Sequence, residues 1–122
     1  MAPRIELLDD RLRIDYLGLE QLLVLRDKID VRYDHIRAVE VGLDRVPSPW
    51  ALRLGLSVPW SDRRAGWFWS EGRKLFLDVK DRQRAVVLRL REAAPFDAVA
   101  IQVERPDELA DALRERARGS AP

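Results

Sequence analysis

The chain has 122 residues, with 22 basic and 21 acidic side chains, a net charge of +1 and no cysteine. The balanced charge argues against non-specific binding of nucleic acid, which requires a basic field. The lack of cysteine excludes disulfides, thiolate metal sites and cysteine nucleophiles. This length suits one domain with its own core, so we expect a single domain over residues 1–118, a polar tail at 119–122 and no nucleic-acid partner.

The N-terminal sequence "IELLDDRLRID" predicts two short strands around a turn at Asp9-Asp10. The next segment, residues 18–25, does not alternate. Its leucines recur at positions i, i+3 and i+4, which indicates a short helix. The opening residues "MAPRIELLDD" meet acidic side chains before a signal peptide could form. No apolar run approaches the roughly 20 residues of a membrane-spanning helix, so we expect a soluble, cytoplasmic protein.

Residues 28–42, "KIDVRYDHIRAVEVG", return to a period of two. They predict two strands separated by a turn at Asp34-His35. Ile36 and Val39 are both apolar but differ in parity, so only one of them could face the core from a regular strand. We therefore expect a bulge or bend between these two residues.

The second half of the chain predicts further strands, which alternate apolar and polar residues or flank a Gly turn. They cover residues 51–58, 67–69, 74–80, 84–91 and 97–104. The sequence "PDELADALRERA" then predicts a helix over 106–117. Pro106 suits a first helical position, because its missing N–H costs nothing there. Acidic residues in the first turn and arginines in the last complement the helix dipole.

This order of elements predicts a mostly β fold, a barrel or sandwich of about seven or more antiparallel strands. A short helix is inserted near 18–25, and the helix at 106–117 caps one end. No parallel α/β sheet is indicated.

Several segments together resemble the bacterial pleckstrin-homology-like (PH-like) domain proteins. They are "IDVRYDHIRAVEV", "LRLGLSVP", "AGWFWSEGRKLFLDV" and "VERPDELADALRERA", and the resemblance covers about residues 4–117. It implies two near-orthogonal antiparallel sheets in a partly open barrel, plugged by the C-terminal helix. Eukaryotic relatives often bind phosphoinositides through a basic loop between the first two strands. The matching junction here, "LDDRLR", is as acidic as it is basic.

The aromatic residues of "AGWFWSEGRKLFLDVK" lie on two strands that a two-residue turn at Glu71-Gly72 would join. That turn pairs residues 67–70 with 73–76 in reverse order, so Trp67 lies opposite Phe76. If the leucines of the second strand face the core, Phe68 joins them.

On that reading Trp67, Trp69 and Phe76 lie on the opposite face beside Lys74. A three-residue turn would shift the register by one and place Phe68 and Phe76 outside instead. Either register leaves at least two aromatic rings on the face away from the core. An apolar cluster of this size needs cover. The helix at 18–25 or a nearby loop, a second copy or protein partner, and lipid are the alternatives.

The loop at 59–66, "PWSDRRAG", carries Trp60, Arg63 and Arg64. An aromatic ring beside two guanidinium groups suits a lipid headgroup or another anion. The alternative is a solvated loop whose arginines pair with Asp62.

His35 is the only histidine, and no second histidine or carboxylate cluster suggests a metal site. No nucleophile elbow or phosphate-binding Gly loop is present. We expect no catalytic residue, cofactor or metal. The sequence predicts a non-catalytic PH-like scaffold that self-associates as a homo-oligomer or docks to a protein through Trp67, Trp69, Phe76 and Lys74. The alternative is a peripheral membrane protein that binds anionic lipid headgroups through the 59–66 loop.

Overall fold

The structure of the protein is a computed structural model that describes residues 4–16, 28–43, 52–54, 64–70 and 72–120. The helix expected at 18–25 lies outside these residues. Strands β1 (Arg4–Leu7), β2 (Arg11–Asp15) and β3 (Lys28–Arg32) form one antiparallel sheet in that order.

A second sheet has the strand order β4-β8-β9-β7-β6-β5. Its strands are β4 (Ile36–Val41), β5 (Leu52–Leu54), β6 (Arg64–Ser70), β7 (Arg73–Val79), β8 (Ala85–Leu90) and β9 (Ala98–Gln102). Short 3₁₀ turns, η1 (Tyr33–His35) and η2 (Arg82–Arg84), precede β4 and β8, and the helix α2 (Pro106–Ser120) follows β9.

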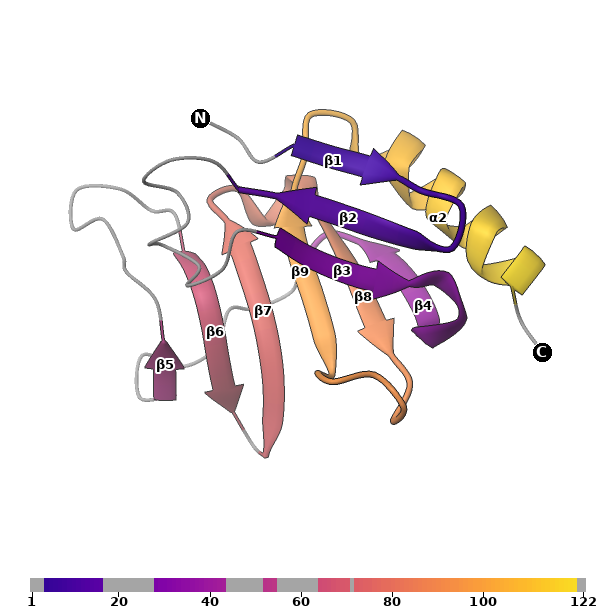
Figure 1. The fold of residues 1–122 in the computed structure, drawn as a ribbon. Coiled ribbons are helices and arrows are strands. Elements are labelled where there is room, and N and C mark those ends of the chain that lie inside the picture. The colour runs from indigo at the N-terminus through magenta and orange to yellow at the C-terminus, as the bar shows by residue number, and fades with distance from the viewer. Residues whose placement is uncertain (1–3, 17–27, 44–51, 55–63, 71, 121–122) are drawn as a thin grey trace.

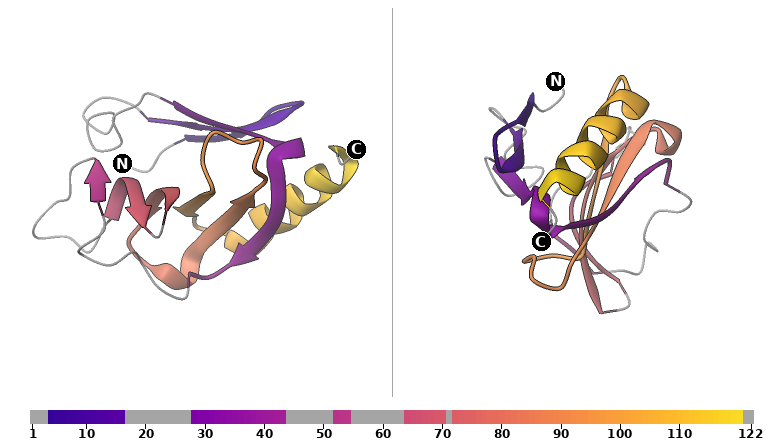
Figure 2. Two further views of the ribbon diagram at one scale, coloured as in Figure 1. Left: turned by 90° about the horizontal axis from the view of Figure 1, so that it is seen from below. Right: turned by 90° about the vertical axis from the view of Figure 1, so that its right-hand side faces the viewer.

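The three-stranded sheet packs over one face of the six-stranded sheet, as Figures 1 and 2 show. The helix α2 lies along one side of this pair of layers and contacts β4, β8 and η1. Two sheets with a C-terminal helix confirm the expected mostly β, sandwich-like class. Over the residues that the structure describes, the strands form two separate sheets and no closed barrel.

The expectation that every strand is antiparallel is wrong at one place. Strand β9 pairs with β8 in the antiparallel sense but with β7 in the parallel sense. Because β7 and β8 run in opposite directions, a strand inserted between them must be parallel to one of the two. Alternation along a strand reports which way its side chains face, and it carries no information about neighbouring strands.

The N-terminal sheet follows its sequence closely. Strands β1 and β2 flank the expected turn at residues 9–10. Leu12 and Ile14 of β2 and Ile29 and Val31 of β3 are buried against the six-stranded sheet. The charged residues between them lie on the other face, so this sheet is apolar on one side only.

The expected irregularity in β4 is confirmed. The register of β4 against β8 shifts between Ile36 and Ala38, which leaves Arg37 as the extra residue of a bulge. Ile36 and Val39 are both buried in the core as a result, although their parity differs. The bulge also directs the Arg37 side chain into solvent.

The six-stranded sheet is buried on both faces. The face toward the small sheet contributes Trp67, Phe76 and the alternate residues of β8 and β9 to the main core. The opposite face carries a second buried cluster, which consists of Phe68, Leu77, Val79, Ala85, Val87 and Ala100, with Leu43 and Leu75 packed against it. A sheet buried on both sides has no polar face that could identify the core side from the sequence.

The helix α2 begins at Pro106 as expected and runs to Ser120, three residues beyond the predicted end at 117. Ala110 and Leu113 are buried in the main core, so the helix closes one side of it. No helix in the part of the chain that the structure describes is long and apolar enough to cross a bilayer.

Candidate anion-binding pocket

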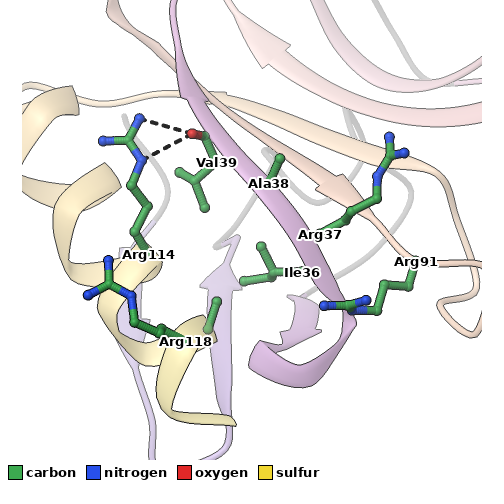
Figure 3. Close-up of a pocket in the computed structure, with 8 residues that line it drawn as sticks. Ile36, Arg37, Ala38, Val39, Arg91, Arg114 and Arg118 are labelled. Carbon is green, nitrogen blue, oxygen red and sulfur yellow. Dashed lines mark hydrogen bonds between the residues drawn. The ribbon is translucent and has the colours of Figure 1, made fainter. Parts of the chain in front are cut away.

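A pocket of about 230 Å³ lies between β4 and α2 (Figure 3). It is lined by Ile36, Arg37, Ala38, Val39, Arg91, Arg114, Ala117 and Arg118. Half of these residues are arginines, and the lining includes no carboxylate among the residues that the structure describes. The other half are alanine or aliphatic residues, so the pocket has a small apolar floor and a cationic rim.

Three elements supply the four arginines. Arg37 is the bulge residue of β4, and Arg91 follows the end of β8, where its backbone N–H donates to the His35 carbonyl oxygen at 2.8 Å. Arg114 and Arg118 are four residues apart on α2, which places them on the same face of the helix. Figure 3 shows both projecting from the helix, with Arg37 and Arg91 beside β4.

Arg114 already has protein partners. Its Nε and one terminal nitrogen donate to the Val39 carbonyl oxygen at 3.2 and 2.9 Å. Its other terminal nitrogen lies 3.2 Å from the Asp111 carboxylate. Among the described strands β4 is at one end of its sheet, and the Val39 carbonyl oxygen accepts from the helix. Arg114 therefore holds the helix against the free edge of β4 and fixes one wall of the pocket.

The other three arginines are available to a ligand. Within the described part of the chain, no carboxylate forms an ion pair with Arg37, Arg91 or Arg118. All three side chains are exposed. Arg89 lies on β8, two residues before Arg91. It differs from these three arginines because its Nε lies 2.7 Å from the Glu40 carboxylate. The pocket thus has three arginines in its lining that pair with no carboxylate among the described residues.

Arginine favours one kind of ligand chemistry. Its planar guanidinium group donates two parallel hydrogen bonds to a carboxylate or phosphate. The pocket residues offer no acid–base pair and no nucleophile, because they are arginine, alanine, isoleucine and valine. The arrangement can bind and orient an anionic group.

The aromatic residues predicted to form an outer surface are placed differently. The hairpin register is the expected one, with Trp67 opposite Phe76 and Trp69 opposite Lys74. Gly72 adopts a positive φ of 77°, as a tight turn requires. However, Trp67 and Phe76 are 4% and 0% exposed and belong to the main core. The prediction that they face outward is wrong, because Phe68 and the leucines face a second buried cluster instead.

Trp69 and Lys74 are half-buried at one end of this hairpin. The Lys74 Nζ lies 4.8 Å from the centroid of the Trp67 ring and 5.5 Å from that of Trp69. The Lys74 backbone N–H donates to Asp97 at 2.7 Å. These contacts give Lys74 a local cation–π role.

The predicted lipid-binding residues fall mostly outside the described part of the chain. Trp60 and Arg63 lie outside the described residues, and of Arg64 only the backbone, at the start of β6, is described. Strand β6 is four positions from β4 in the sheet, a separation of roughly 19 Å.

His35 lies beside Asp34, with its Nε2 3.9 Å from the carboxylate. Within the described ranges, no group of three or more metal-ligating side chains occurs.

The arginine pocket was not identified from the sequence, although the sequence contains partial signals of it. The predicted bulge marks Arg37, and the spacing of Arg114 and Arg118 places them on one helical face. Arg91 has no distinguishing local pattern. The pocket brings together residues from 36 to 118, so only the tertiary arrangement of β4, β8 and α2 assembles it.

Comparison of the chain with protein-family models, with curated proteins and with solved structures found no match. The PH-like resemblance therefore stays an expectation from the sequence.

Proposed function

We propose that this protein is a non-catalytic binding module that holds an anionic group of its ligand in the pocket between β4 and α2. The observation that carries the proposal is a set of three exposed arginines that line one recess, Arg37, Arg91 and Arg118, and that pair with no carboxylate in the described part of the chain. Like charges gathered at one site repel each other, and a bound anion relieves that repulsion.

Anion binding at such a site depends on short-range contacts. The net charge of +1 gives the whole molecule little long-range attraction for anions. Binding therefore depends on direct hydrogen bonds from the guanidinium groups, and it weakens as salt screens the remaining Coulomb attraction.

Titration with inorganic phosphate, followed by amide NMR, tests the proposal. We expect shifts in residues 36–39, 91 and 114–118, and about a tenfold loss of affinity for Arg37→Gln or Arg118→Gln, which corresponds to roughly 1.4 kcal/mol. Arg105→Gln is the matched control. Arg105 precedes α2 and pairs with Glu108 at 3.6 Å, at the far end of the helix from Arg118. Phosphate binding that is absent, or equally weakened by the control, contradicts the proposal.

Self-association or docking to a protein through the β6–β7 hairpin is a second proposal. Its support is narrower than the sequence suggested, because it rests on the half-buried Trp69 and Lys74 alone. Tryptophan is enriched in interface cores. The membership in the PH-like family, with its partly open barrel, is likewise proposed on the quoted sequence motifs, and an experimental structure that covers residues 17–27 and 44–63 tests it.

A further inference from the structure

We infer that the anionic group held in this pocket is a phosphate monoester on a phosphorylated side chain of a partner protein. The inference rests on the proposed function and narrows it to one ligand class. Three features of the pocket support this inference: its charge, its size and its surroundings.

The charge of the pocket favours phosphate over carboxylate. Arg37, Arg91 and Arg118 bring three positive charges with no ion-pair partner among the described residues. A phosphate monoester carries about −1.5 to −2 charges at neutral pH and has three strong acceptor oxygens. A carboxylate brings a single charge and two oxygens, which would leave most of the guanidinium donors without an acceptor.

The size of the pocket favours an end group of a larger molecule. Sites that bury a whole small-molecule ligand occupy about 300–1,000 Å³, whereas this pocket measures about 230 Å³. Its floor is formed by small or buried side chains, Ala38 and Ala117 among them, so a compact group can enter and little else. The rest of the ligand then lies outside on the protein surface.

The surroundings favour a protein over a membrane. Peripheral membrane binding combines basic residues with apolar or aromatic side chains that insert between lipids. Here the apolar lining residues Ile36 and Val39 are buried in the core, and the exposed part of the lining is arginine. Beside the pocket, α2 packs against β4, so a phosphorylated side chain would reach the recess from the surface, where Arg37, Arg91 and Arg118 are exposed.

The first experiment compares phenyl phosphate with phenyl sulfate, which have the same shape but different charge. At about pH 8, where the phosphate is a dianion, we expect it to bind about tenfold more tightly than the sulfate. At about pH 5 the phosphate has lost its second charge, since that pKa is near 6, and the preference should disappear.

The sulfate ester also controls for protonation of the protein. Titratable side chains around the pocket include Asp111, which contacts Arg114, the Asp34–His35 pair that precedes β4, and the sequence neighbours Glu40, Glu92 and Glu115. Their protonation would change the affinity for both esters. Equal affinity for the two esters at about pH 8 overturns the phosphate inference and leaves the proposed function standing. Binding of neither ester overturns both.

The second experiment identifies the carrier. The protein is incubated with a degenerate phosphotyrosine and phosphoserine peptide library, with the same library dephosphorylated, and with vesicles that contain phosphatidic acid. We expect retention of phosphorylated peptides only, and loss of that retention in Arg37→Gln and Arg118→Gln but not in Arg105→Gln. Binding to the vesicles without binding to phosphopeptides overturns the protein-partner inference in favour of a lipid.

Discussion

The Tyr16 hydroxyl donates a buried hydrogen bond of 2.7 Å to the Asp78 carboxylate, and it thereby connects the three-stranded sheet to the six-stranded one. The two residues are 1% and 5% exposed. Tyr16→Phe removes this donor from a buried acceptor, which costs about 1–3 kcal/mol of unfolding free energy. Chemical denaturation followed by tryptophan fluorescence measures the change.

Tyr33→Phe is the comparison for this variant. It deletes the same hydroxyl group from a hydrogen bond of 2.7 Å to the Leu8 carbonyl oxygen, which is neutral. Bonds between neutral groups contribute about 0.5–1.5 kcal/mol, so Tyr33→Phe should be the milder substitution. Equal unfolding free energies of Tyr16→Phe and the unmodified protein would show that the inter-sheet hydrogen bond does not stabilise the fold.

The burial of Trp67 makes a second prediction. Its ring packs against Phe76 and Phe96 at centroid distances of 5.0 and 5.2 Å. Trp67→Ala should therefore lower the unfolding free energy by about 3–5 kcal/mol through loss of buried contacts. The measurement is thermal or denaturant unfolding.

Trp69→Ala serves as the matched substitution on the same strand, because Trp69 is half-buried. It should cost less stability than Trp67→Ala. If the β6–β7 hairpin mediates self-association, light scattering should show an oligomer that Trp69→Ala shifts toward the monomer. A monomer at high concentration before any substitution rules out that proposal.

A third prediction distinguishes the effect of Arg37 on the fold of β4 from its effect on anion binding. Deletion of Arg37 brings Ile36 and Val39 to positions i and i+2, which share one face of a regular strand, so both side chains should stay in the core. Substitution Arg37→Gln keeps the extra residue and should leave stability within about 0.5 kcal/mol while weakening phosphate binding. A large loss of stability in the deletion variant, with Ile36 or Val39 exposed, would contradict this account of the bulge.

A fourth prediction concerns the two arginines on α2. Arg114→Gln removes both hydrogen bonds to the Val39 carbonyl oxygen and should cost about 1 kcal/mol. It also uncovers the outer edge of β4, so association at high concentration should increase. Arg118→Gln should reduce anion affinity with little change in unfolding free energy. The reverse order of stabilities would show that the two roles are assigned wrongly.

The fifth prediction is a pH dependence. Hydrogen bonds from Arg13 at 2.8 and 3.1 Å hold the pKa of Asp30 below its ordinary value of 3.8. Because the folded state lowers this pKa, the ion pair stabilises the fold above the ordinary value. That contribution is lost as the pH falls through the folded-state pKa.

Asp30→Asn should therefore make the unfolding free energy less dependent on pH between about pH 6 and pH 3. Part of the dependence should remain, because hydrogen bonding from Arg11 lowers the pKa of Asp10 to about 2. An unchanged pH profile in Asp30→Asn would show that the Arg13 pair does not contribute.

Local rules predicted the hairpin of β6 and β7 in detail and misassigned its faces. Alternation and the Gly72 turn determine which residues are opposite each other, so the pairing of Trp67 with Phe76 followed from the sequence. Which side is buried depends on what packs there. Phe68 and Trp67 are both large and apolar, and both are buried, in different clusters. The sequence "AVVL" in β8 carried the available signal, since a strand buried on both faces reads as a continuous apolar run.

The candidate pocket was less predictable from the sequence than the hairpin. Its position depends on the register of β4 against β8 and on the side of the sheet that α2 covers. Two signals were visible locally. They are the irregularity at Ile36 and Val39, which parity requires, and the four-residue spacing of Arg114 and Arg118. That Arg37 lines the same pocket as Arg118, which is 81 positions later in the chain, follows from tertiary packing.

The insertion of β9 between β7 and β8 has a consequence during synthesis. Residues 98–102 leave the ribosome after both neighbouring strands, so β7 and β8 wait with unpaired backbone groups along their facing edges. Such edges recruit strands from other chains. Until β9 is synthesised, these two edges are therefore open to misassembly with other chains.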